Sequence, residues 1–272
     1  MAEWKSSLLL LAYLVEIMPF QKLSIPGSQS SSLQARLDLP EAASPKAYAL
    51  FAHCFTCNKN YKAISNISRA LIRANIAVLR FDFTGLGESD GDFADTNFSS
   101  NVADLIAVAD FLGAEFETPK LLIGHSLGGA AVLQAAAKIN ATRAVVTINA
   151  PCDPAYVVRH LGQAPDIIAE QGEAEIFLAG RPFTITKQFL DDLDQTRMRI
   201  TIRQMGKPLL IFHAPDDDTV GIDNATHIFQ AAQHPKSFIA LDQADHLLTH
   251  SRDSTYVGTL IAAWARPYLE ET

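Results

Sequence analysis

The sequence has 272 residues, of which 48% are hydrophobic and 19% charged, with 14 Gly and 13 Pro, so a disordered chain and a collagen-like fibre are excluded. Thirty acidic against 22 basic residues give a net charge of −8, which disfavours nucleic acids and anionic membranes as main partners, because both attract basic surfaces. Three cysteines are too few for a disulfide-stapled scaffold and fit a reducing compartment, so we predict a cytoplasmic protein.

The N-terminus contains an apolar run at residues 8–15, LLLLAYLV. This run is shorter than the ~20 residues that a membrane-spanning helix needs. A signal peptide is the alternative, but Glu3 precedes the run and no small-residue cleavage site follows it. We therefore predict that residues 1–17 are an N-terminal extension outside the fold and that residues 18–272 form one domain.

From residue 32 onward, apolar strand-like segments alternate with segments whose apolar residues recur every three or four positions. Repeated strand–helix units predict an α/β fold with a doubly wound, mostly parallel sheet. The first segment alternates polar and apolar residues, which is typical of a half-exposed edge strand. The predicted strands are 32–39, 46–53, 77–83, 120–124, 144–149, 208–213 and 237–241, and the predicted helices are 63–75, 100–112, 127–139, 224–233 and 255–268.

The alternation breaks at about residues 151–206, which contain no long buried strand. A turn at residues 179–182 predicts a hairpin, and a charged helix is predicted near residues 187–205. We interpret the segment as a lid insertion above the carboxyl edge of the sheet, where folds of this class place their ligands. Its aromatic residues either line an acyl pocket or belong to the core: Tyr156, Phe177, Phe183 and Phe189.

The motif Gly124-His125-Ser126-Leu127-Gly128 follows an apolar strand and opens a helix. In this context G-x-S-x-G predicts a sharp strand-to-helix turn that exposes a nucleophilic serine above the sheet. The glycines permit the turn because they carry no Cβ. The alternative is a glycine-rich turn in which Ser126 only caps the helix.

A serine hydroxyl needs a base, and the base needs a carboxylate that orients it. His246 lies in a loop just after the last predicted strand, and we predict that it is the base. Asp217 follows the preceding predicted strand, so the chain order Ser–Asp–His is that of α/β-hydrolases. Its spacing from His213 favours Asp217 as the acid, although Asp216 and Asp218 stand beside it.

An acyl-transfer enzyme also needs hydrogen-bond donors for the oxyanion of the tetrahedral intermediate. We predict the backbone N–H groups of Leu127 and Phe55, the second in the turn after the strand 46–53. Cys54 and Cys57 in the same turn form a C-x-x-C pair, which suits a redox site or half of a zinc site. Because the sequence has no second C-x-x-C, we favour a structural role for the pair.

Taken together, the segments FAHCFTCNKN, RFDFTGLGESDGDFADTNFSSN and IGHSLGGAA resemble the α/β-hydrolase superfamily. Over roughly residues 18–268 the sequence is similar to the hydrolase half of bacterial hydrolase/OsmC fusion proteins. The resemblance implies the α/β-hydrolase fold and a triad of Ser126, Asp217 and His246. It also implies an OsmC-type protein as a candidate partner. Cys54 departs from the family, since many members have Gly at this position.

These observations predict a serine hydrolase that cleaves a small ester, thioester or amide through an acyl-enzyme, without a cofactor or a metal ion. Its partner is then a small-molecule acyl substrate, with no nucleic acid and no membrane. The alternative is a thiol-redox or partner-binding module that works with an OsmC-type peroxidase through Cys54 and Cys57.

Overall fold

The computed structural model describes residues 19–29, 31–42, 44–55, 57–178 and 181–270. The predicted N-terminal extension, residues 1–17, lies outside the described residues. None of the helices in the described ranges is long and apolar enough to cross a membrane.

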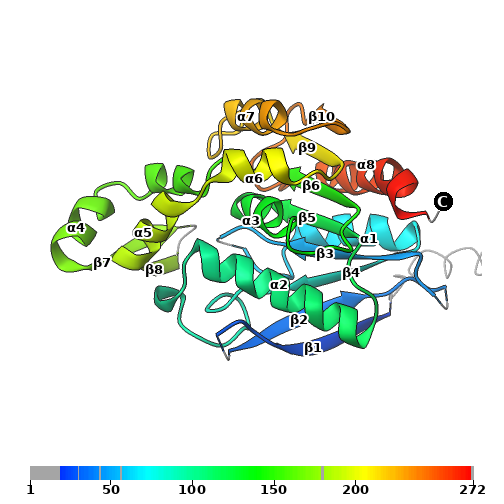
Figure 1. The fold of residues 1–272 in the computed structure, drawn as a ribbon, viewed down its shortest axis with the longest axis horizontal. Coiled ribbons are helices and arrows are strands. Elements are labelled where there is room, and N and C mark those ends of the chain that lie inside the picture. Colours follow the sequence, from blue (N-terminus) through cyan, green and yellow to red (C-terminus); the bar gives the residue numbers. More distant parts are fainter. Residues whose placement is uncertain (1–18, 30, 43, 56, 179–180, 271–272) are drawn as a thin grey trace, which may run out of the picture.

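An eight-stranded, mostly parallel sheet forms the centre of the molecule, with the strand order β1-β2-β4-β3-β5-β6-β9-β10 (Figure 1). Only β2 pairs antiparallel, with β1 on one side and β4 on the other. All residues of β3, β4, β5, β6 and β9 are buried, as expected for strands covered on both faces. The strands are β1 (Phe20–Pro26), β2 (Ser32–Asp38), β3 (Ala47–Ala52), β4 (Ile76–Phe81), β5 (Leu121–His125), β6 (Ala144–Ile148), β9 (Leu209–His213) and β10 (Lys236–Ala240).

Helices cover both faces of this sheet and complete two hydrophobic cores. On one face, α1 buries Ile64, Ile67 and Leu71 against the strands and packs beside α8. On the other face lie α2, α3, α6 and α7 (Figure 1). A capping box between Asn97 and Ser100 begins α2. These helices are α1 (Lys62–Arg73), α2 (Phe98–Glu115), α3 (Leu127–Ala135), α6 (Met198–Gln204), α7 (Asp223–Ala231) and α8 (Ser251–Leu269).

The chain between β6 and β9 projects from one end of the sheet as a separate group of short elements (Figure 1). Two of them, β7 and β8, pair antiparallel with each other, which confirms the predicted hairpin. The other end of this group, α6, packs against α3 and α7 of the core. The elements that precede α6 here are the 3-10 helix η2 (Pro154–His160), α4 (Ala164–Gln171), β7 (Glu173–Leu178), β8 (Arg181–Thr186) and α5 (Lys187–Gln195).

The mostly parallel α/β sheet is confirmed, and two details of the prediction were wrong. The segment 32–39 is not an edge strand, because β1 pairs along its whole length and forms the edge. The predicted helix 187–205 is two helices, because Thr196 adopts an extended conformation between α5 and α6. The break at Thr196 has no Gly or Pro signal in the sequence.

The strand order also determines where a ligand fits. Strand β3 has β4 as its neighbour on one side and β5 on the other. The strand order therefore reverses direction at β3, because β5 is followed by β6 and β9 on the side away from β4. In open α/β sheets the crevice lies outside the carboxyl ends of the strands at such a switch point. The segments that leave β3 and β5 there begin with His53 and Ser126.

Candidate active site

Ser126 occupies the sharp turn between β5 and α3, with φ 55° and ψ −126°. This left-handed conformation is strained for a residue with a Cβ, and such strain is found mainly at functional sites. Close packing permits the turn only with glycines around it, since a Cβ on Gly124 would collide with the Gly128 carbonyl. A Cβ on Gly128 would collide in turn with the carbonyl groups of Ala52 and His53. The turn therefore holds the serine at the carboxyl end of β5.

His246 and Asp217 complete a chain of hydrogen bonds that begins at Ser126. The His246 Nε2 atom lies 3.0 Å from Ser126 Oγ, and its Nδ1 atom lies 2.8 Å from Asp217 Oδ2. Since a carboxylate only accepts hydrogen bonds, Nδ1 carries the proton and Nε2 is left to accept the serine proton. All three residues come from loops at the carboxyl ends of strands, as the sequence predicted for their positions.

The Asp217 carboxylate is held firmly by its own loop. Its Oδ1 atom accepts hydrogen bonds from the backbone N–H groups of Thr219, at 2.9 Å, and Val220, at 2.8 Å. Burial raises the pKa of Asp217, but the hydrogen bond from His246, its electrostatic interaction with the carboxylate and the two backbone donors outweigh this effect, so the pKa lies below its usual value. Asp217 is buried, whereas Asp216 and Asp218 are exposed.

Two buried side chains hold the backbone of His246. The His246 carbonyl accepts hydrogen bonds from His125 Nε2, at 2.7 Å, and from Asn149 Nδ2, at 2.9 Å. The Asn149 Oδ1 atom accepts a hydrogen bond from the backbone N–H of Ala214. Asn149 therefore joins the loops that follow β6, β9 and β10. Burial, as the largest effect, lowers the pKa of His125 to about 3. His125 therefore stays neutral and donates through Nε2 at neutral pH.

The two predicted oxyanion donors lie beside Ser126. Leu127 is the first residue of α3, and Phe55 follows β3 in the neighbouring loop. Both residues line the same cavity as Ser126 and His246. Within the described residues neither backbone N–H makes a hydrogen bond, so both are available to a ligand oxygen.

A mostly apolar cavity of about 270 Å³ lies over the serine, between the sheet edge and η2. Of the four aromatic residues predicted either to line an acyl pocket or to belong to the core, Tyr156 lines this cavity. Phe183 and Phe189 pack against Phe55 instead, and Phe177 is 70% exposed. A larger hollow of about 690 Å³ is lined by Lys46 and Lys120, just before β3 and β5, so it lies at the opposite end of the strands. The cavity over Ser126 is lined by Cys54, Phe55, Ser126, Leu127, Pro151, Tyr156, Val157, His160, Thr219, Val220, His246 and Leu247.

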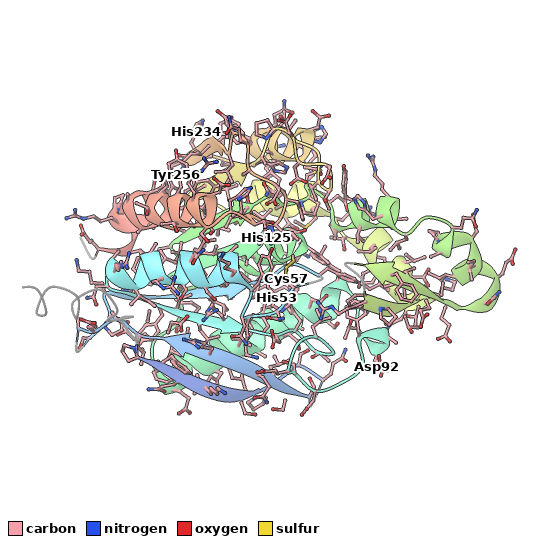
Figure 2. All side chains as sticks on the ribbon, turned by 180° about the vertical axis from the view of Figure 1, so that it is seen from behind. His53, Cys57, Asp92, His125, His234 and Tyr256 are labelled. Atoms are coloured by element: carbon pink, nitrogen blue, oxygen red, sulfur yellow. A yellow bond between two sulfur atoms is a disulfide. The ribbon has the colours of Figure 1, made fainter. Side chains whose placement is uncertain are left out.

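The cysteine pair of the loop after β3 forms a disulfide bond between Cys54 and Cys57. Both cysteines are buried, in the loop that carries Phe55. Figure 2 shows Cys57 close to His125 in the interior, away from His234 and Tyr256 on the surface. The third cysteine, Cys152, is a free thiol.

Sequence reasoning missed Asn149, whose side chain bridges three loops. One signal was present, because an Asn directly after a buried strand is among the few residue types that adopt a positive φ readily, and Asn149 has φ 47°. Its three partners could not be read from the sequence, since they depend on how the strands are ordered.

Comparison with known proteins places this site in a family. A sequence model of the alpha/beta hydrolase family matches residues 49–258. The chain therefore belongs to the alpha/beta hydrolase family, and it is a hydrolase with esterase-like relatives. This confirms the fold and the family that the sequence motifs predicted.

Individual relatives agree with this assignment. The crystal structure of an esterase domain from a Rhodothermus marinus protein is 52% identical, with a TM-score of 0.78, and the match covers 93% of this chain and 100% of that chain. The mitochondrial palmitoyl-protein thioesterase ABHD10 of Rattus norvegicus is 32% identical over 87 residues, which are 32% of this chain and only 28% of the rat protein. The structure of mouse alpha/beta hydrolase domain-containing protein 10 shares the fold, with a TM-score of 0.75 at 20% identity over 92% of this chain and 99% of that chain.

Proposed function

We propose that this chain is a serine hydrolase that cleaves a small ester, thioester or amide through an acyl-enzyme. The observation that carries the proposal is the chain of hydrogen bonds from Ser126 through His246 to Asp217, placed under an apolar cavity. The relation to an esterase domain at 52% identity supports the same reaction class. Localisation in the cytoplasm and an OsmC-type partner stay predictions from the sequence.

In the proposed mechanism, Ser126 Oγ attacks the acyl carbonyl carbon and passes its proton to His246 Nε2. The Asp217 carboxylate stabilises the resulting imidazolium, and the backbone N–H groups of Phe55 and Leu127 bind the oxyanion. His246 then returns the proton to the leaving oxygen, sulfur or nitrogen. Water, deprotonated by His246, hydrolyses the acyl-enzyme and frees Ser126.

The size of the cavity supports a small acyl group. Pockets that enclose drug-sized ligands have volumes of about 300–1,000 Å³. The cavity over Ser126, at about 270 Å³, is just below this range. Its walls include Tyr156 and Val157 of η2, so we propose that the insertion at residues 151–206 shapes the acyl site.

The test is Ser126→Ala, because this change removes one hydroxyl from an otherwise unchanged turn. We expect hydrolysis of p-nitrophenyl butyrate to fall by ~10⁴–10⁶-fold, as for other triad residues. A fluorophosphonate probe should label the wild-type chain and the control variant Ser99→Ala, whose serine is exposed, but not Ser126→Ala. More than a tenth of wild-type turnover in folded Ser126→Ala would refute the proposal.

A further inference from the structure

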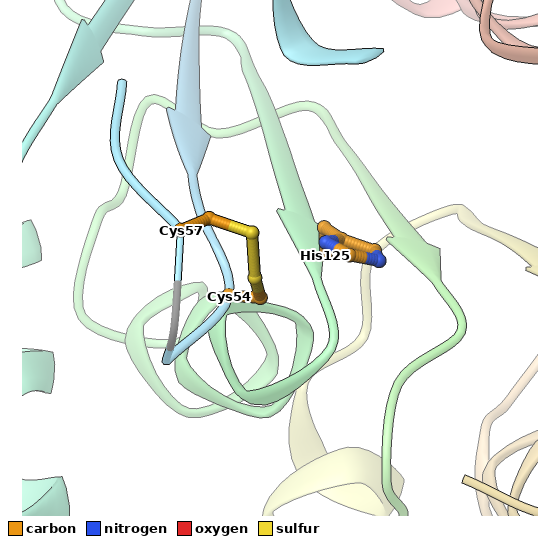
Figure 3. A group of neighbouring side chains, drawn as sticks. All are labelled: Cys54, Cys57 and His125. Carbon is orange, nitrogen blue, oxygen red and sulfur yellow. A yellow bond between two sulfur atoms is a disulfide. The ribbon is translucent and has the colours of Figure 1, made fainter. Parts of the chain in front are cut away.

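The disulfide between Cys54 and Cys57 lies next to a side chain that the proposed mechanism does not use chemically. Figure 3 shows the ring of His125 beside the two sulfur atoms, with the cysteines on the loop after β3 and the histidine at the end of β5. One possible metal-ligand atom from each of Cys54, Cys57 and His125 lies within 4.8 Å of the others, and all three residues are buried. The fold thus supplies a third ligand to a C-x-x-C pair that the sequence leaves incomplete.

The hydrogen bonding of His125 prepares one ring nitrogen for a metal ion. Its Nε2 donates to the His246 carbonyl at 2.7 Å, so Nδ1 carries the lone pair. Metal-binding histidines almost always donate their other N–H to a carbonyl or a carboxylate in this way.

The chemistry of the three ligands selects the metal. Two thiolates and one imidazole suit Zn²⁺, and the cluster contains no carboxylate of the kind that Mg²⁺ and Ca²⁺ prefer. Tetrahedral Zn²⁺ with Zn–S bonds of about 2.3 Å and Zn–N bonds of about 2.1 Å holds its ligand atoms about 3.6–3.8 Å apart. After reduction, the two sulfur atoms must separate by about 1.7 Å from their bonded distance, and the ligand atoms that lie up to 4.8 Å apart must approach by about 1 Å, to meet this spacing.

Charge balance also suits a buried ion. Two thiolates neutralise the charge of Zn²⁺, so the completed site adds no net charge to this interior. Three protein ligands leave a fourth position for water or for the neighbouring Ser126 hydroxyl. Cys54 precedes Phe55, and His125 precedes Ser126, so one metal ion would link the loops that carry the proposed oxyanion donor and the nucleophile.

We propose that the chain with Cys54 and Cys57 reduced binds one Zn²⁺ through both sulfur atoms and His125 Nδ1, and that the bound ion inhibits hydrolysis at Ser126. A dithiol reductant supplies two electrons and two protons, which break the disulfide into two thiols while the reductant forms its own disulfide. Zn²⁺ then displaces the two thiol protons into solvent. The inhibition rests on the proposed function, whereas metal binding does not.

Zinc binding is measured on the full chain after its disulfide has been reduced with a phosphine, which takes oxygen from water and becomes the phosphine oxide. The reduced chain is then desalted in the absence of oxygen. After addition of ZnCl₂ and a second desalting, we expect one bound zinc per reduced chain and less than about a fifth of that for the disulfide form. Cys57→Ser and His125→Asn should each weaken binding by at least about tenfold, while Cys152→Ser, which removes the free thiol, should not. Co²⁺ in place of Zn²⁺ should show a thiolate charge-transfer band in reduced wild type and lose it in Cys57→Ser.

Equal zinc binding by the reduced and disulfide forms, or by wild type and Cys57→Ser, would overturn the site. Inhibition is tested separately: Zn²⁺ should lower p-nitrophenyl butyrate hydrolysis by reduced wild type and reduced Cys152→Ser at least about tenfold, and a chelator should restore it. Bound zinc with unchanged hydrolysis would overturn the inhibition. A chain without any esterase activity would refute the proposed function, and its zinc content would still decide the metal site.

Discussion

Replacement of Asp217 by Asn should invert the proton arrangement at His246. Oδ1 of Asp217 accepts from two backbone N–H groups, those of Thr219 and Val220, and Oδ2 accepts from His246 Nδ1. In the variant, only the amide oxygen can face the two backbone donors, so the NH₂ group must face His246. An NH₂ group only donates, and Nδ1 must therefore accept. The imidazole proton then moves to Nε2, where it faces Ser126, and the ring can no longer take the serine proton.

We expect this inversion to lower kcat/KM for p-nitrophenyl butyrate by about 10⁴-fold, or about 5 kcal/mol in the activation free energy, with the fold retained. Asp216→Asn and Asp218→Asn are the matched controls, since both side chains are exposed, and each should change the rate less than about tenfold. Initial rates and circular dichroism on the three variants decide the matter. A folded Asp217→Asn enzyme with more than a tenth of wild-type activity, or a larger loss at either control, would refute the reasoning.

Three further predictions follow from the site. In a series of p-nitrophenyl esters, acetate to hexanoate should have kcat/KM at least about tenfold above palmitate, because the cavity is small; an equal value for palmitate would contradict this. Asn149→Ala should lower the free energy of unfolding by about 2 kcal/mol, because it leaves the Ala214 N–H unpaired, and should lower kcat but not KM; unchanged kcat would exclude a positioning role. Burial lowers the pKa of His213, so below pH ~6.5 the unfolded state binds a proton that the folded state does not bind. The free energy of unfolding therefore decreases as the pH is lowered, by up to about 2 kcal/mol at pH 5. Urea unfolding at pH 7.5 and pH 5 should show a smaller loss for His213→Gln, and equal losses would count against this assignment.

The sequence predicted the buried strands well because their burial on both faces leaves a direct composition signal. Strand β3, AYALFA, is entirely buried, and its apolar composition predicted it without knowledge of the neighbouring strands. Strand β1, FQKLSIP, was missed because it is mostly exposed, and its place depends on its pairing with β2 and on the packing of Ile25 in the core. The break between α5 and α6 at Thr196 was missed for a related reason, since only the packing of the two helices on different neighbours requires it.

For the site, the positions of Ser126, Asp217 and His246 could be chosen because each follows a strand, and parallel strands end at one edge of a sheet. The choice among three consecutive aspartates rested on spacing alone, and the structure places Asp217 beside His246. The contacts of His125 and Asn149 with the His246 carbonyl depend on how three loops meet, so local sequence contains no trace of them. The same is true of the approach of His125 to the cysteine pair.

The aromatic ring of Phe55 connects the insertion to the loop that carries the proposed oxyanion donor. It contacts Phe93 of the 3-10 helix η1 (Phe93–Asp95), Phe183 of β8 and Phe189 of α5, with ring centroids 4.6, 5.4 and 6.0 Å away. An insertion that only covered the cavity could diverge freely as the enzyme adapted to new substrates. Here a substitution at Phe183 or Phe189 reaches the cavity through the Phe55 ring, and the same shift would move the Phe55 backbone N–H that is proposed to bind the oxyanion. We therefore expect a substitution that moves the Phe55 ring to change substrate preference and the rate of ester hydrolysis together.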